Sequence, residues 1–143
     1  MLLAGDQAAR LMREYGVKGA TDVTGFSLIG HAWEMAEASS VTIEIASSAV
    51  PLVSGALGLA AEGLMTGGDK TNRQYVAERA FIAGSVSTEL GRLLFDPQTA
   101  GGMLIAIDSD RSDALLAALR HHYPEAAIIG RATEPQQHSI VVT

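Results

Sequence analysis

Cysteine is absent from the 143-residue sequence, which excludes a disulfide scaffold, a cysteine-ligated metal site and a cysteine nucleophile within the chain. Aromatic residues make up only 5%, so the core must be built largely from Ala, Leu, Ile, Val and Met. No apolar run approaches the roughly 18 residues of a transmembrane helix. No basic run is present and the net charge is −6, which argues against direct binding to nucleic acid or to an acidic membrane. The lack of cysteine fits a cytoplasmic protein.

The apolar content and the periodic segments of the sequence indicate a globular α/β domain. Hydrophobic residues reach 48% and charged residues 18%, and this length is enough for one domain with a real core. Periodicity predicts helices over 6–15, 25–38 and 110–121, and strands over 41–45, 103–107, 126–132 and 139–142. Weaker patterns predict a short helix within 49–64, a helix or ordered loop over 70–80, a helix over 87–94, and turns over 17–24 and 66–69. We therefore expect a layered α/β sandwich with a mixed, mainly antiparallel sheet packed with helices.

A carboxylate and two hydroxyls gather in residues 20–31, which read ATDVTGFSLIGH. Thr24 is a good N-cap for the helix expected next, and Asp22 would sit just before that helix. The positive end of a helix stabilises a carboxylate or a phosphate, and an Asp beside phosphates is a usual anchor for Mg²⁺. Asp22 therefore has two interpretations, a magnesium ligand or simply a helix-start or turn residue. His31 is expected to be a hydrogen-bonded structural residue, with a role as ligand or base as the alternative.

Two further stretches are rich in glycine. Residues 94–104 read LFDPQTAGGML, a turn at Asp-Pro followed by paired glycines and a strand. Backbone N–H groups there could face a phosphate, or the stretch could be a structural loop that enters a core strand. Residues 66–72 read TGGDKTN and fit either a loop that faces a cleft or a tight turn in which Asn72 bonds back to the backbone. This stretch is not a Walker A loop.

The first stretch resembles the ATDVTGFGLLGH motif of the selenophosphate synthetases (selenide, water dikinases), in the second domain shared by the aminoimidazole ribonucleotide synthetase superfamily. The second resembles the LLxDPQTSGGLL string of that family, and the third a Pro-Gly-Gly-Thr-x-x-Asn loop. The departures from these motifs include Ser27 for Gly, Ala100 for Ser, Thr66 for Pro and Asp69 for Thr. The three motifs together span most of the chain.

The resemblance implies that residues 1–143 are the C-terminal domain of a two-domain ATP-dependent enzyme. That enzyme makes selenophosphate, AMP and phosphate from selenide, ATP and water. Asp22 matches a magnesium ligand that serves ATP. The candidates for further cleft contacts are Thr21, Thr24, Gly67, Gly68, Asn72, Gln98 and Thr99. The absent N-terminal domain would supply the reactive Cys or selenocysteine, a catalytic Lys and most ATP contacts, and it would form most of the homodimer interface. We therefore expect no catalytic residue in this chain and no activity from it alone.

Other interpretations stay open at this point. The chain could belong to another enzyme of the superfamily, such as aminoimidazole ribonucleotide synthetase, formylglycinamidine ribonucleotide synthetase, thiamine-monophosphate kinase or a hydrogenase-maturation protein. It could also be a non-catalytic binding or assembly domain. The string DPQTAGG argues for the selenium enzyme or for formylglycinamidine ribonucleotide synthetase.

Overall fold

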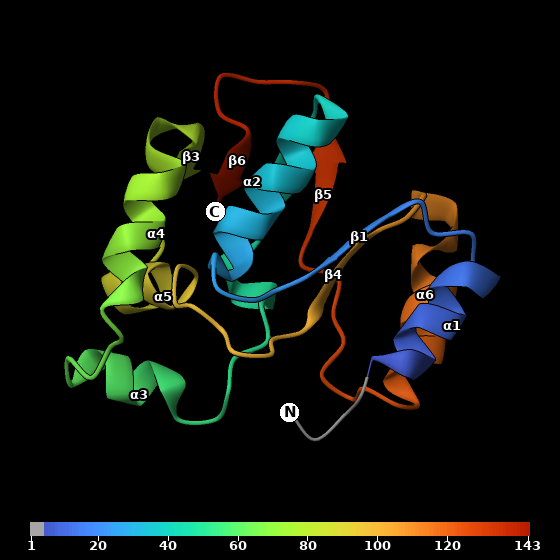
Figure 1. Ribbon diagram of the computed structural model, residues 1–143, viewed down its shortest axis with the longest axis horizontal. Coiled ribbons are helices and arrows are strands. Elements are labelled where there is room, and N and C mark those ends of the chain that lie inside the picture. The colour runs from blue at the N-terminus through green and yellow to red at the C-terminus, as the bar shows by residue number, and fades with distance from the viewer. Residues whose placement is uncertain (1–4) are drawn as a thin grey trace.

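A four-stranded mixed sheet forms the larger part of the molecule (Figure 1). The computed structural model describes residues 5–143. The strand order is β3-β6-β2-β5, with bounds Ala80–Ile82, Ile140–Val142, Thr42–Ile45 and Gly130–Thr133. Strand β6 runs parallel to both β2 and β3, whereas β5 is antiparallel to β2. The predicted mixed α/β class is confirmed.

Helix α2 (Ser27–Ser39) packs across this sheet and supplies the centre of the core. Its residues Ile29, Ala32 and Ala36 are completely buried. Two of the three are alanines, whose small side chains let the helix backbone come close to the strands. The residues that pack against α2 come from the sheet, from helix α4 (Gly68–Val76) and from the chain just after helix α5 (Thr88–Leu93). They are Ile45, Ile140, Val142, Val76, Leu94 and Phe95.

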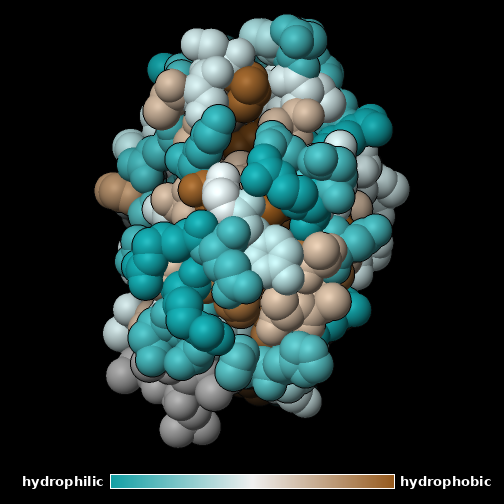
Figure 2. Space-filling view, turned by 90° about the vertical axis from the view of Figure 1, so that its right-hand side faces the viewer, coloured by the Kyte–Doolittle hydropathy of each residue, from teal (hydrophilic) through white to brown (hydrophobic). Residues whose placement is uncertain are grey.

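A two-stranded antiparallel ribbon leads from this core to a pair of helices. Strand β1 (Gly19–Asp22) pairs with β4 (Met103–Ala106), and the ribbon ends at α1 (Asp6–Glu14) and α6 (Ser109–Arg120). These helices bury a second, smaller apolar cluster made of Ala8, Leu11, Leu115 and Leu119. Figure 2 shows the molecule from this side, where hydrophilic side chains cover most of the surface and apolar ones show only in smaller areas between them. Both helices therefore have one buried and one solvated face.

The remaining helices are short. They are α3 (Ala56–Ala61) and the 3-10 turns Ser47–Ala49 and Ala77–Arg79. The helices expected within 49–64, over 70–80 and over 87–94 are therefore confirmed, each in shortened or shifted form, as α3, α4 and α5. Among residues 5–143, no helix combines the length and the apolar character that crossing a bilayer requires.

The structure corrects several expectations about elements. Residues 17–24 are not simply a turn, because 19–22 form strand β1. The strand predicted over 126–132 begins only at Gly130. Strand β4 was expected to be a core strand, but its end residues Met103 and Ala106 are exposed, because within residues 5–143 it pairs with β1 alone. The three-residue strand β3 was missed altogether, since it is too short to show a period.

Candidate functional site

The ribbon brings the first two sequence stretches together at one end of the larger core. Asp22 is opposite Met103 in the register of β1 and β4. Beyond the strands the pairing continues, because the Val23 N–H donates to the Gly102 carbonyl at 2.9 Å and the Gly101 N–H donates to the Val23 carbonyl at 3.0 Å. Residues 20–31 and 94–104 therefore lie side by side, although about 75 residues separate them in the chain.

One of the paired glycines is required by this close approach. A Cβ atom on Gly101 would lie 2.4 Å from the Val23 carbonyl oxygen, a distance that no real Cβ contact tolerates. A Cβ on Gly102 would meet nothing within 4 Å. The N–H groups of Gln98 and Gly101 are also taken, by the carbonyls of Thr24 and Val23. These two N–H groups therefore hold the loop 98–101 against the residues that follow β1. They serve the structural role of the stretch and are not free to face a phosphate.

The third stretch joins the first two through Asn72. Its side-chain amide donates to the Gly25 carbonyl and to the Phe95 carbonyl, each at 3.0 Å, and the residue is only 5% exposed. Nearby, the Thr66 hydroxyl donates to Asp96 at 2.6 Å. A Cβ on Gly68 would come within 2.5 Å of the Pro97 ring. We call this buried contact of the three stretches around Asn72 the Asn72 junction.

The expected tight turn over 66–69 is wrong, because helix α4 begins at Gly68. Asn72 does bond to backbone carbonyls, but it does so from inside a helix and to segments 23 and 47 residues away. Gly67 is exposed at the start of that helix, and its Cβ position is open. The predicted role of these residues as cleft contacts stays a prediction.

Asp22 differs from these residues because its side chain is exposed and makes no hydrogen bond or ion pair within residues 5–143. It ends strand β1, and α2 begins only at Ser27. Asp22 is therefore not a helix-start residue, and its role as a magnesium ligand or as a residue that leads into a turn stays a prediction. We call Asp22, the preceding Thr21 and the adjoining loop 99–102 the ribbon end. Thr21 makes one weak hydrogen bond, from its hydroxyl to the Asp22 carbonyl at 3.3 Å, and Thr99 is exposed.

The ribbon end offers Mg²⁺ one carboxylate ligand, that of Asp22. Mg²⁺ keeps several waters and is commonly bound through one or two carboxylates together with substrate phosphates. The exposed, unpartnered carboxylate of Asp22 suits such a contact. No group of three or more His, Asp or Glu side chains in the described part of the chain is placed to hold a metal ion. Any further ligands must therefore come from substrate, water or another part of the protein.

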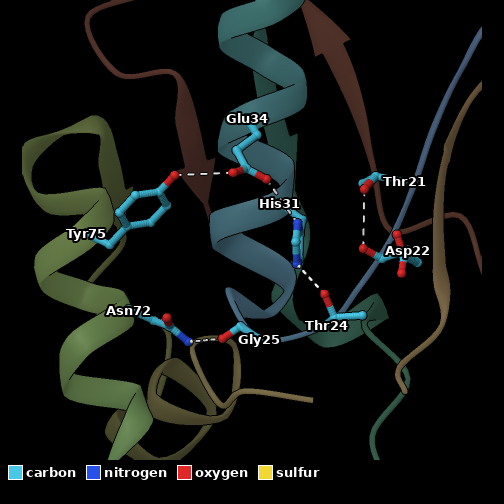
Figure 3. A network of polar contacts seen from close by, with 8 residues as sticks. All are labelled: Thr21, Asp22, Thr24, Gly25, His31, Glu34, Asn72 and Tyr75. Carbon is cyan, nitrogen blue, oxygen red and sulfur yellow. Dashed lines mark hydrogen bonds and ion pairs between the residues drawn. The ribbon is translucent and has the colours of Figure 1, made fainter. Parts of the chain in front are cut away.

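Thr24 does not cap α2, because its hydroxyl is engaged elsewhere. The N-cap position is Phe26, which makes no side-chain cap, and Thr24 contributes only its carbonyl, which accepts from the Ser27 N–H at 3.0 Å. The Thr24 hydroxyl lies 3.0 Å from Nε2 of His31, whose Nδ1 lies 3.0 Å from a Glu34 carboxylate oxygen (Figure 3). His31 is 8% exposed and lies within hydrogen-bonding distance of a partner at both ring nitrogens, so the expected hydrogen bonding of this residue is confirmed.

An ion pair in the third stretch escaped the sequence analysis. Asp69 is 2% exposed and accepts from Nε of Arg92 at 2.8 Å. The Arg92 guanidinium holds the pKa of the Asp69 carboxyl below its ordinary value. Both residues line an open depression of about 430 Å³, beside Arg73, whose guanidinium lies 4.4 Å from the Phe95 ring centre. The only sequence signal was that Asp69 stands where the similar loop has Thr.

Ser27 occupies a position whose backbone favours glycine. Its φ angle is 66°, in the left-handed region that costs a residue with a Cβ roughly 1–2 kcal/mol. The side chain is completely buried, and its hydroxyl oxygen has no hydrogen-bond partner in the part of the chain that the structure describes. The glycine of the motif that this stretch resembles is therefore explained by conformation, and Ser27 is tolerated at a cost in stability.

Comparison with known proteins agrees with the motif resemblance. The family model "AIR synthase related protein, C-terminal domain" matches residues 1–143. Selenide, water dikinase of Porphyromonas gingivalis is 42% identical over 146 residues, which cover 100% of this chain and 41% of that protein. The enzymes of that name from Caldanaerobacter subterraneus and Geobacter metallireducens are 41% and 40% identical, over 95% and 99% of this chain. The chain spans about two-fifths of the length of these curated relatives.

A solved structure supports the fold independently of the motifs. The crystal structure of hydrogenase maturation protein HypE matches with a TM-score of 0.58 and 20% sequence identity, over 90% of this chain and 33% of that one. At this identity the likeness concerns the fold alone. Together, the full-length family match and the sequence relatives show that the chain belongs to the family of AIR synthase related protein C-terminal domains.

Proposed function

We propose that this chain is the C-terminal domain of a selenophosphate synthetase, and that it contributes one magnesium ligand and one wall of the active-site cleft. The observation that carries the proposal is the position of Asp22. Its carboxylate is exposed and has no partner within residues 5–143, and it lies at the edge of a region where the N–H groups of Gln98 and Gly101 and the side chain of Asn72 are hydrogen-bonded. The chain is about 40% identical to enzymes named selenide, water dikinase, which supports assigning this carboxylate to a phosphate-bound metal.

The chemistry expected of this domain is positioning. Phosphoryl transfer depends on alignment and on neutralising charge on the phosphate oxygens, which Mg²⁺ supplies when bound. Asp22 would hold the ion with one oxygen, and its place is fixed by the pairing of β1 with β4. Thr21 and the loop of Gln98 and Thr99 would form the adjoining cleft wall. The hydrogen bonds of the Asn72 junction would keep Thr21 and the loop of Gln98 and Thr99 at fixed positions relative to each other.

The remainder of the enzyme lies outside this chain in the proposal. ATP, selenide and water are the proposed substrates, and an N-terminal domain would supply the nucleophile, a lysine and most nucleotide contacts. The proposed homodimer would form mainly through that domain. Because the chain has no cysteine and presents one candidate ligand, we expect residues 1–143 alone to make no selenophosphate.

The test is a magnesium titration of the full-length protein that carries this chain, with selenophosphate followed by phosphorus NMR. The variant Asp22→Asn keeps the size of the side chain and removes the charge that Mg²⁺ requires, so most activity should be lost and high Mg²⁺ should restore part of it. Asp113→Asn, an exposed carboxylate on α6, is the matched control and should behave as wild type. Wild-type turnover of Asp22→Asn at low Mg²⁺ would contradict the proposal.

A further inference from the structure

Thr24, His31 and Glu34 form a hydroxyl–imidazole–carboxylate chain whose protons can be assigned from chemistry. A carboxylate only accepts hydrogen bonds, so the contact of 3.0 Å between Glu34 and Nδ1 requires a proton on Nδ1. In neutral His31 the other nitrogen, Nε2, then carries a lone pair. The Thr24 hydroxyl, 3.0 Å away, must therefore donate to Nε2. This is the arrangement in which an imidazole can take a proton from a hydroxyl.

The carboxylate end of the chain is held firmly. The Tyr75 hydroxyl donates to the second Glu34 oxygen at 3.2 Å. Burial, and the carboxylate of Glu34 beside it, raise the pKa of the Tyr75 phenol, so the hydroxyl keeps the proton that it donates. The Tyr75 ring stacks on Phe26 at 4.6 Å and meets the edge of Trp33 at 4.9 Å. Glu34 is thus fixed from α2 and α4 together, as Figure 3 shows.

The hydroxyl end lies next to the proposed metal ligand in the chain. Thr24 follows Asp22 by two residues, and its carbonyl is fixed by the N–H groups of Ser27 and Gln98. With its proton directed to His31, the Thr24 oxygen keeps lone pairs for a group outside the chain. A purely structural tie between the loop and α2 would need only the contact to His31, and it would not require a carboxylate on the far ring nitrogen.

We propose that Thr24, His31 and Glu34 are a proton relay that serves the water-consuming step of the phosphoryl-transfer reaction. The inference rests on the proposed function, since the relatives are named as dikinases that use water. Thr24 touches the attacking water and His31 takes the proton through Thr24. Glu34 and Tyr75 are positioning residues, because they set the tautomer of the ring and its orientation.

In the proposed step, one bond to phosphorus forms, one breaks, and each proton has an acceptor. The water oxygen forms a bond to phosphorus as the bond from phosphorus to the leaving phosphate oxygen breaks. One water proton passes to Thr24 Oγ1 while the Thr24 hydroxyl proton passes to Nε2 of His31. The imidazolium that forms is stabilised by Glu34. After product release the proton returns through Thr24 to solvent, so no oxidant, reductant or further reactant is consumed.

The titratable groups that contact the ring or its carboxylate partner are Glu34 on α2, bonded to Nδ1, and Tyr75 on α4, bonded to Glu34. Phe26 contributes only its ring, 5.6 Å from that of His31.

The first experiment measures steady-state kinetics of the full-length protein. Thr24→Val keeps the shape of the side chain and removes the hydroxyl, so kcat should fall about a hundredfold with little change in KM for ATP. Thr24→Ser restores a hydroxyl and should recover most of the loss. The control Thr71→Val, at an exposed position of α4, should match wild type. A purely structural tie would instead lower the free energy of unfolding of Thr24→Val and leave its kcat unchanged.

The second experiment reads the ring directly, by nitrogen-15 NMR of histidine-labelled full-length protein. His31 should show the Nδ1–H form, and Thr24→Val should shift the Nε2 resonance while the exposed His121 stays in place. An Nε2–H form of His31, or wild-type kcat in Thr24→Val, would overturn the relay. If the wild-type protein itself makes no selenophosphate, the proposed function fails and the relay fails with it. Activity in both wild type and Thr24→Val rejects the relay alone.

Discussion

The Asn72 junction and the ribbon end are built from the same sequence stretches, but polar side chains are buried and hydrogen-bonded at the junction and exposed at the ribbon end. At the junction the Asn72 amide is buried and both of its bonds go to backbone carbonyls. At the ribbon end the Asp22 carboxylate is exposed and has no partner within residues 5–143. A motif in a sequence thus contains residues of two kinds, those that hold the chain in place and those that remain available for chemistry. Measurements of stability should separate the two kinds.

The largest loss of stability is expected from Asn72→Ala. The substitution removes two hydrogen bonds and leaves the carbonyls of Gly25 and Phe95 buried without a donor, at a cost of about 2–4 kcal/mol in the free energy of unfolding. Denaturant unfolding measures the change, with the exposed neighbour Thr71→Ala as the control, expected to stay within about 0.5 kcal/mol of wild type. Equal effects of the two substitutions would remove the basis for calling Asn72 a structural residue.

A pair of glycines offers a second test at the boundary between the two regions. Gly101→Ala forces a Cβ against the Val23 carbonyl and should cost about 1–3 kcal/mol. Gly102→Ala, one residue on, places its Cβ in open space and should change stability by less than about 0.5 kcal/mol. Thermal unfolding of the two variants side by side gives the difference. If Gly102→Ala were the more harmful, the described approach of the loop to β1 would be wrong.

Acid should weaken the Asp69–Arg92 pair. The pKa of Asp69 is lowered in the folded state, so its contribution is complete above the ordinary carboxyl range near pH 4 and is lost as the pH falls through the folded-state pKa. Asp69→Asn should therefore cost about 1.5 kcal/mol at pH 7 and progressively less at lower pH. Unfolding curves of wild type and Asp69→Asn between pH 7 and pH 2 provide the measurement. A constant difference across this range would exclude the ion pair as the cause.

Ser27→Gly should make the protein more stable, by about 1 kcal/mol. Glycine adopts the positive φ angle without strain, and the substitution removes a buried hydroxyl that has no partner. The control is Ser39→Gly, at the last residue of α2, which should lose about 0.5 kcal/mol through helix propensity alone. Destabilisation by Ser27→Gly would indicate that the Ser27 hydroxyl makes a contact that the structure does not show.

The smallest effect on folding is expected from Asp22→Asn. The side chain is exposed and has no partner within residues 5–143, so the free energy of unfolding should change by less than about 0.5 kcal/mol. Calorimetry of the variant used in the magnesium titration gives this value. A large loss of stability would move Asp22 into the same class as Asn72 and would weaken its assignment as a metal ligand.

The sequence predicted the elements that carry a clear hydrophobic period. Helices α1, α2 and α6 were found because each buries one face against the core, and strand β2 because its apolar residues alternate. Strand β1 was missed since its four residues, Gly-Ala-Thr-Asp, are small or polar and take their conformation from β4, more than 80 residues further along the chain. The strands near the C-terminus are close in sequence, but β2 lies between them.

The candidate site also has features that the sequence indicated and features that depend on contacts between distant residues. The convergence of the three stretches could be expected from their resemblance to one family, but no local pattern indicates that Asn72 bonds to Gly25 and Phe95. The pairing of Asp69 with Arg92 likewise depends on how α4 and α5 meet. The left-handed backbone at Ser27 could not be predicted from a serine. Long-range packing determines these features, and a single sequence does not record it.

The smaller cluster between α1 and α6 has a consequence for how the protein opens in solution. It buries Ala8, Leu11, Leu115 and Leu119, a smaller set of apolar side chains than the core beneath α2 contains. The two-stranded ribbon connects it to that core, so the two helices can separate while β1 and β4 stay paired. Backbone amides of α1 should therefore exchange with deuterium through a cooperative sub-global opening, well before those of α2. Asp22 lies at the far end of the ribbon, on the side of the slowly exchanging core, and keeps its place during such openings.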